Sequence, residues 1–345
     1  MNKSEEQVHW SKDADPLSED TFPFYYALVI LPICAVGLCG NALSIAVFCG
    51  PAFRTKSINV LLAAIAVAKL LLLLSSVPNF LPDAHLPSWL YVAAILHVYP
   101  VSVMFHCCSV WLLVAVTFER WVAVCRPLSA HRYCSRRRAV VCIGLIAIVA
   151  MAFNAPRFWD AKVVWYSGED FGFSKNLQAN ENYVFWYKTV AYNCAIYIGP
   201  LSVISIGNWL IAKGLARSQS LRRSSISSEQ KANETTAYML LYVVLLFVIS
   251  YTLCLILNML DTFYPRFLES TKLGALLVPI NNGLVAVNAS TDCFLYLKFS
   301  SRYRGAAYTL LHGACQQPDS HYVPVRRGTE DLDHIDLQKI SMQLW

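Results

Sequence analysis

Four charged side chains lie inside or at the end of long apolar segments, and their types point to chemistry within a membrane. Lys69 falls in the second apolar segment, Asp292 in the seventh, and Glu119-Arg120 close to the end of the third. A charge in hydrocarbon costs several kcal/mol unless a partner or water relieves that cost. Such residues therefore pair with one another, line a proton or ion pathway, or change partners between two states. For Glu119 and Arg120 a plain boundary role is the alternative, because basic residues commonly flank the cytoplasmic ends of spans.

The chain shows no sequence pattern of an enzyme or a metal protein. We find no phosphate-binding glycine loop, no metal-ligand cluster, and no Ser, His and Asp set at a shared membrane depth. The 12 cysteines do not follow a zinc-ligand spacing. We therefore expect no enzymatic activity, no catalytic residue, no metal and no cofactor.

The elements that must position these charges are long apolar helices. Of the 345 residues, 56% are hydrophobic and only 14% are charged, and the mean hydropathy is +0.44. A helix needs about 20 apolar residues to cross a hydrocarbon core of roughly 30 Å. We expect an all-α membrane protein, a seven-transmembrane helix bundle, with spans near residues 24–50, 57–81, 90–125, 138–156, 184–212, 236–260 and 272–298.

Three further segments flank the bundle at residues 24–298. Residues 1–23 form a polar extracellular tail without the basic start and short apolar core of a signal peptide, so the first span is expected to direct insertion. Residues 299–314 are predicted to form a short amphipathic eighth helix along the membrane, and 315–345 a cytoplasmic tail.

Basic residues gather in alternate connections, and this sets the expected orientation. Runs such as Arg136-Arg137-Arg138 would face the cytoplasm, because cytoplasmic loops hold an excess of Lys and Arg. The chain is then a multi-pass plasma-membrane protein with its N-terminus outside and its C-terminus in the cytoplasm. A basic inner face suits anionic lipid and acidic protein surfaces, and bases spread over membrane loops do not indicate nucleic-acid binding. No cysteine lies in a predicted outer loop, so no extracellular disulfide is expected.

Several short strings, in the correct order, resemble those of rhodopsin-like (class A) G-protein-coupled receptors. Gly40-Asn41, Glu119-Arg120 and Pro200 carry the resemblance, which covers about residues 24–314. Within that superfamily the chain is similar to invertebrate FMRFamide and myosuppressin-type neuropeptide receptors, through the strings Val98 to Pro100, Glu119 to Leu128, His131 to Cys134 and Asn154 to Trp159.

The resemblance implies a G-protein-coupled receptor for a neuropeptide, specifically an FMRFamide-like peptide that ends in Arg-Phe-amide. Its implied partners are an extracellular amidated peptide, a heterotrimeric G protein, arrestin, a receptor kinase and membrane lipid. Arg120, held by Glu119 at rest, would be released to meet the G protein, and Tyr296 would belong to the same switch. Ser102 and Ala286 stand where amine receptors place an acid and opsins a lysine, which favours a peptide ligand.

The chain departs from the resembled pattern in its core. Lys69 stands near the place of the superfamily's usual second-span Asp, and Asp292 lies in the seventh span. In the resembled fold these positions face each other beside Asn41 and Asn288, so we expect an ion pair with Lys69 in the place of a sodium ion. The alternative is that Lys69 snorkels to the membrane interface, although roughly 12 Å of helix separate it from that end.

Polar and aromatic side chains in the outer halves of the spans indicate a ligand cavity. The candidate pocket residues are Tyr99, His106, Tyr192, Asn193, Tyr251, Asn258, Asn281 and Asn282. For each asparagine, interhelical hydrogen bonding is an equally good explanation. The guanidinium of an Arg-Phe-amide ligand would bind a carboxylate, and the sequence leaves open which of these supplies it: Asp160, Glu169, Asp170, Asp261 or Glu269.

Candidate modification sites lie near the termini and in one inner loop. Phosphorylation of Ser224 and Ser225 would add negative charge to a basic loop, although a solvated linker is the simpler explanation of that stretch. Cys315 follows the predicted eighth helix as a candidate palmitoylation site. Asn2 begins a candidate glycosylation sequence.

Two other functions stay open. The four membrane charges could serve a transporter, although the chain shows no evident repeated half and no matching pair of interrupted helices. An orphan or constitutively active receptor is the second alternative, because Lys69 already supplies a cation to the core.

Overall fold

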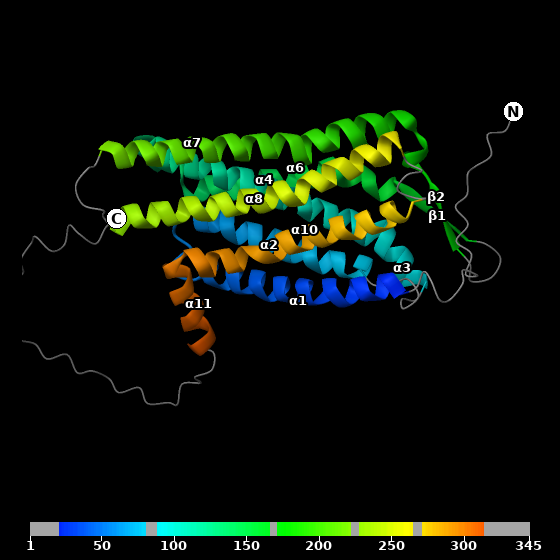
Figure 1. Cartoon of the computed structure of the whole chain (residues 1–345), viewed down its shortest axis with the longest axis horizontal. Helices are drawn as coiled ribbons and strands as arrows, with labels where there is room; N and C mark the ends of the chain where they lie inside the picture. The colour runs from blue at the N-terminus through cyan, green and yellow to red at the C-terminus, as the bar shows by residue number, and fades with distance from the viewer. Residues whose placement is uncertain (1–20, 81–87, 166–170, 222–227, 265–270, 314–345) are drawn as a thin grey trace, which may run out of the picture.

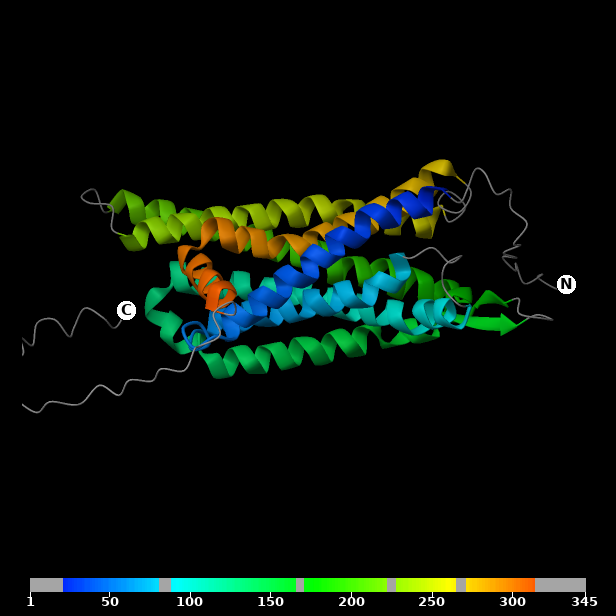
Figure 2. The ribbon, with the colours of Figure 1, turned by 90° about the horizontal axis from the view of Figure 1, so that it is seen from below.

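Long helices run side by side in an elongated bundle (Figure 1, Figure 2). The computed structural model describes residues 21–80, 88–165, 171–221, 228–264 and 271–313. The predicted seven-helix fold class is confirmed, and the long helices are α1 (Thr21–Cys49), α2 (Ser57–Phe80), α4 (Tyr99–Cys125), α6 (Arg136–Asn154), α7 (Gly199–Leu221), α8 (Ser228–Phe263) and α10 (Lys272–Phe299).

Several helical stretches are long and apolar enough to cross a membrane. Within the described residues there are five, at Tyr26–Cys49, Ser57–Pro78, Leu96–Cys125, Arg136–Trp159 and Tyr183–Gly214. A shorter apolar helix, Leu245–Leu260, lies within α8. Because α8 packs against α7 and α10, and α10 packs against α1, these helices belong to the same bundle.

Two spans begin with π-helical turns, and in each span a proline follows these turns. η2 (Ala94–Val98) precedes Pro100, while η5 (Tyr183–Ala191) and η6 (Asn193–Ile198) precede Pro200. Proline lacks the N–H of the regular helical hydrogen bond, and its ring clashes with the carbonyl four residues back. The wider π turns accommodate this clash, and π-bulges occur frequently at functional sites.

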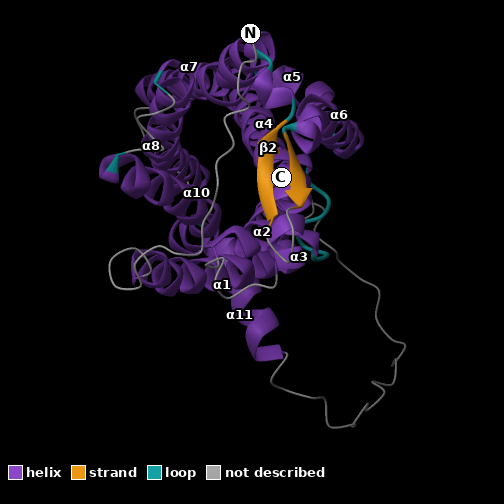
Figure 3. Ribbon diagram, turned by 90° about the vertical axis from the view of Figure 1, so that its right-hand side faces the viewer, coloured by secondary structure: helices purple, strands orange, loops and turns teal. Residues whose placement is uncertain are grey.

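A β-hairpin covers one end of the bundle, and a short helix leaves the other end (Figure 1, Figure 3). Strands β1 (Ala161–Trp165) and β2 (Phe171–Lys175) pair antiparallel, with Trp165 opposite Phe171. Helix α11 (Ser301–Gly313) follows α10 at the opposite end. We call these the hairpin end and the α11 end. The remaining short elements are α3 (Ser88–Ala93), α5 (Pro127–Tyr133), η3 (Ala155–Trp159) and η4 (Leu177–Ala179).

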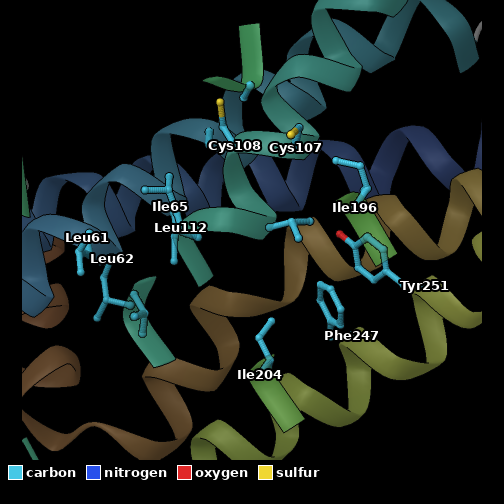
Figure 4. Packing of buried hydrophobic residues seen from close by; sticks show 14 of the residues in the cluster. Leu61, Leu62, Ile65, Cys107, Cys108, Leu112, Ile196, Ile204, Phe247 and Tyr251 are labelled. Carbon is cyan, nitrogen blue, oxygen red and sulfur yellow. The ribbon is translucent and has the colours of Figure 1, made fainter. Parts of the chain in front are cut away.

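Close contacts between helices build the core. A Cβ added to Gly37 on α1 would lie 2.8 Å from Ser290 Cβ on α10, so a glycine permits this close approach. An apolar cluster fills the middle of the bundle (Figure 4), and its members include Leu61, Leu62, Ile65, Cys107, Cys108, Leu112, Ile196, Ile204, Phe247 and Tyr251. This packing fixes the helices that carry the charged and polar side chains of the site.

Candidate functional site

A cavity of about 250 Å³ lies between α2, α4, α8 and α10, in the half of the bundle near the hairpin end. Phe80, Val103 and Leu257 give it apolar walls. The structure brings six of the eight predicted pocket residues to its lining: Tyr99, His106, Tyr192, Asn258, Asn281 and Asn282. Mostly apolar walls with a few convergent polar groups are typical of ligand sites.

Two residues predicted for the pocket, Tyr251 and Asn193, are not among the residues that line it. Tyr251 is buried, stacks on His106 with ring centroids 5.2 Å apart, and packs on Phe247 with centroids 4.1 Å apart (Figure 4). The Asn193 side-chain amide points into its own helix and donates to the Thr189 carbonyl over 2.7 Å. The Asn193 amide nitrogen is therefore engaged with its own helix, and the Tyr251 ring is packed against His106 and Phe247.

Two of the lining asparagines also join helices. The Cys254 thiol on α8 donates to Asn281 Oδ1 on α10 over 2.9 Å. Asn258 Nδ2 donates to the Tyr197 hydroxyl over 3.2 Å. Asn258 and Asn281 therefore line the cavity and also make the interhelical hydrogen bonds that were the alternative explanation for them.

Arg157 also lines the cavity, although the sequence did not suggest it as a pocket residue. It lies in η3 and is 8% exposed, with its guanidinium carbon 4.2 Å from the centre of the Tyr192 ring. An arginine at the end of an apolar span looks like a boundary charge in the sequence. In the structure η3 turns the chain toward Tyr192, so the Arg157 side chain points into the bundle.

A buried carboxylate joins the hairpin to the fifth span. Asp160 accepts a hydrogen bond from the Tyr183 hydroxyl over 2.6 Å and lies 3.8 Å from Lys188 Nζ. Its backbone carbonyl accepts from Asn176 N over 3.0 Å. Asp160 is thus committed to internal partners. Of the other carboxylates considered for the ligand, Glu169, Asp170 and Glu269 lie outside the described residues, as does the side chain of Asp261.

Lys69 and Asp292 form an ion pair across the core. Lys69 Nζ lies 2.8 Å from Asp292 Oδ2, with side-chain exposures of 10% and 13%. Lys69 also donates to the backbone carbonyl of Asn288 over 3.2 Å. Asn41 stands nearby and donates to the Ala289 carbonyl over 3.0 Å, which joins α1 to α10. The four residues predicted for the core are therefore neighbours, with Asn288 contributing its backbone oxygen.

Glu119 and Arg120 interact electrostatically but do not form a close ion pair in this structure. The ion pairs within the described residues are Lys69–Asp292 and Lys188–Asp160. Glu119 instead accepts a hydrogen bond from the Ser57 hydroxyl at the start of α2. Consecutive residues on a helix point in different directions, so a neighbour in sequence is a poor partner for a helical side chain.

Tyr296 belongs to an aromatic cluster at the α11 end. Its ring centroid lies 5.2 Å from that of Phe48 and 5.4 Å from that of Tyr303 on α11. The Tyr303 hydroxyl is 2.9 Å from Ser44 Oγ on α1 and 3.5 Å from Cys293 Sγ on α10. Arg120 also interacts electrostatically with Tyr296. The predicted switch residues thus lie next to the contact that attaches α11 to the bundle.

The candidate modification sites lie outside the described residues. These are Asn2, Ser224, Ser225 and Cys315.

The chain is similar to known receptors along most of its length. Residues 40–296 match the model of the 7 transmembrane receptor (rhodopsin family). The FMRFamide peptide receptor frpr-18 of Caenorhabditis elegans is 33% identical over 310 residues, which cover 86% of this chain and 71% of that receptor. The FMRFamide receptor of Drosophila melanogaster is 28% identical over 307 residues, which cover 84% of this chain. They cover only 54% of the Drosophila receptor, so the chain spans little more than half of that relative.

Proposed function

We propose a neuropeptide-receptor function for this chain, because the chain belongs to the rhodopsin family of seven-transmembrane receptors. Members of this family are receptors rather than enzymes. The proposed ligand is an FMRFamide-like peptide that ends in Arg-Phe-amide. This choice is supported by relatives in two animals that are named FMRFamide receptors.

The observation that carries the proposal is the cavity near the hairpin end. It measures about 250 Å³ and combines aromatic, amide and cationic side chains. Pockets that enclose a drug-sized ligand measure about 300–1,000 Å³. A cavity of this size suits one end of a peptide, with the rest of the ligand outside it. The proposed site thus takes a terminal residue rather than a whole peptide.

The proposed orientation places the hairpin end outside the cell and the α11 end in the cytoplasm of a plasma-membrane protein. Basic residues at the start of α6 support it, because Arg136, Arg137 and Arg138 would then be cytoplasmic. On that side we propose contacts with a heterotrimeric G protein, arrestin, a receptor kinase and anionic lipid.

In the proposed mechanism, peptide binding at the cavity changes the packing of the spans, and Arg120 becomes available to the G protein. Glu119 and Tyr296 contact the neighbouring elements that must move: Ser57 on α2 for the first and Tyr303 on α11 for the second. In this mechanism Glu119 and Tyr296 have different partners in the resting and active states of the α11 end, and the difference determines which state is favoured.

A screen of amidated neuropeptides tests the proposal. Cells that express the chain would be exposed to each peptide, and G-protein activation would be recorded. We expect a response to peptides that end in Arg-Phe-amide and none in cells without the chain. Absence of any peptide response, with full activity in unstimulated cells, would instead identify a constitutively active receptor.

A further inference from the structure

We propose that the cavity binds its ligand through a hydrogen-bond acceptor, a carbonyl or carboxylate oxygen, that Arg157 holds, and that the cavity excludes cationic groups. This inference rests on the proposed receptor function for the nature of the ligand. It reverses the expectation from the sequence, in which the receptor supplies a carboxylate to the guanidinium of the ligand.

Arg157 is a buried donor at the cavity with bonding capacity left over. It is 8% exposed and lines the cavity. Its Nε has no hydrogen-bond partner within the described part of the chain. The Tyr192 ring below the guanidinium, 4.2 Å away, stabilises its charge but cannot accept a directional bond from Nε. A buried donor without a partner is costly, so an acceptor oxygen from a ligand would be favoured here.

The charges around the cavity also favour an acceptor. Lys188 lines the cavity together with Arg157, and no lining residue that the structure describes carries a carboxylate. The nearby acid Asp160 is bound by Tyr183 and Lys188. Deeper in the core, Asp292 is neutralised by Lys69. A ligand guanidinium placed inside would meet like charge in a poorly solvated space, which is unfavourable.

This arrangement sets the direction in which an Arg-Phe-amide peptide enters. The terminal phenylalanine would fill the cavity, with its carbonyl oxygen at Arg157 and its ring against apolar walls such as Phe80 and Leu257. The arginine of the ligand would stay outside the cavity, beyond the two cations that line it. Burial of one aromatic ring and one charge-assisted hydrogen bond then provides the anchor.

The sign of the electrostatic potential in the cavity can be measured without any peptide. Asn282 lines the cavity and is exposed, so an Asn282→Cys variant introduces a thiol there. The rates of labelling by an anionic and a cationic thiosulfonate reagent would be measured in membranes. The labelling rate of the unsubstituted chain would be subtracted from each rate. The result would be divided by the rate at which the same reagent reacts with a small free thiol.

We expect the anionic reagent to label Asn282→Cys faster by about fivefold or more, since Arg157 and Lys188 together outweigh the nearby Asp160 carboxylate, and the net positive charge attracts one reagent and repels the other. Adding Arg157→Gln should reduce this ratio, whereas Arg157→Lys should preserve it. Equal rates, or faster labelling by the cationic reagent, in the Asn282→Cys variant with Arg157 intact would overturn the electropositive cavity. Surface expression of each variant identifies those that fail to fold. The labelling of Asn282→Cys with Arg157 intact does not depend on whether the Arg157 variants fold.

A peptide pair tests the acceptor itself. The amidated peptide would be compared with an analogue in which phenethylamine replaces the terminal Phe-amide, so that the terminal carbonyl is missing. We expect the analogue to be about tenfold weaker or worse on the unsubstituted receptor, because a hydrogen bond to a charged group is lost. In Arg157→Gln the two peptides should be nearly equal.

Equal potency of the two peptides on the unsubstituted receptor would refute the role of Arg157. A free-acid peptide identifies the source of the oxygen, because higher potency than the amide indicates a carboxylate and lower potency a carbonyl. If no peptide activates the receptor, the proposed function fails, whereas the labelling ratio still decides whether the cavity is electropositive.

Discussion

Lys69 on α2 and Asp292 on α10 form an ion pair of 2.8 Å in the core of the bundle, with both side chains largely buried. Breaking such a pair on one side leaves an uncompensated buried charge, which costs about 3–5 kcal/mol. We expect Lys69→Met and Asp292→Asn each to lower the thermal stability of the solubilised protein. The double variant should be more stable than either single one, because neither charge then remains.

Thermal unfolding of the four proteins in detergent measures this coupling. Strictly additive losses in the double variant would contradict a direct interaction between the two side chains.

Sodium should not affect this receptor. The Lys69 ammonium occupies the core position next to Asp292 and the Asn288 carbonyl, so this carboxylate already has a cationic partner. Peptide affinity should therefore be the same in sodium chloride and in choline chloride of equal ionic strength. A sodium-dependent affinity in the unsubstituted receptor would show that Lys69 does not fill this place.

Ser57 should stabilise the bundle through Glu119. Its hydroxyl is the hydrogen-bond donor to the Glu119 carboxylate. Ser57→Ala leaves a half-buried carboxylate without this donor, and we expect a loss of about 1 kcal/mol in the free energy of unfolding. Ser202→Ala is the matched control, because the exposed Ser202 only donates to Ile198 within its own helix. Equal shifts in the unfolding temperature of both variants would contradict the contact.

Tyr303 should anchor α11 to the bundle. It is 1% exposed, and its hydroxyl lies 2.9 Å from Ser44 Oγ. We expect Tyr303→Phe to cost about 1 kcal/mol through the lost hydrogen bond, and Tyr303→Ala about 3–5 kcal/mol through the cavity it leaves. Tyr308→Phe is the control on the same helix, since Tyr308 is 65% exposed.

Limited proteolysis near the end of α11, together with thermal unfolding, would report these changes. The result that would count against an anchor is a Tyr303→Ala variant as resistant to protease as Tyr308→Phe.

The spans could be predicted from the sequence because each is a long apolar segment, and the resemblance supplied the register that places Lys69 opposite Asp292. The π-helical turns before Pro100 and Pro200 were not predicted, although proline itself signals a local departure from the regular helix.

The charges at the ends of spans were harder to interpret. Glu119 accepts a hydrogen bond from Ser57, which is 62 residues away along the chain, in addition to its electrostatic interaction with the adjacent Arg120. Arg157 turns toward Tyr192 because η3 redirects the chain after α6. In both cases the partner comes from another helix, and a single sequence does not encode such a contact locally.

Nucleotide exchange on a purified G protein tests the central claim most directly. The receptor would be reconstituted in lipid with the G protein, and exchange would be followed with and without an Arg-Phe-amide peptide. Our account predicts faster exchange with peptide for the unsubstituted receptor, and no acceleration for Arg120→Ala although that variant still binds the peptide. Exchange that no peptide accelerates in the unsubstituted receptor, or that Arg120→Ala supports fully, would contradict the account.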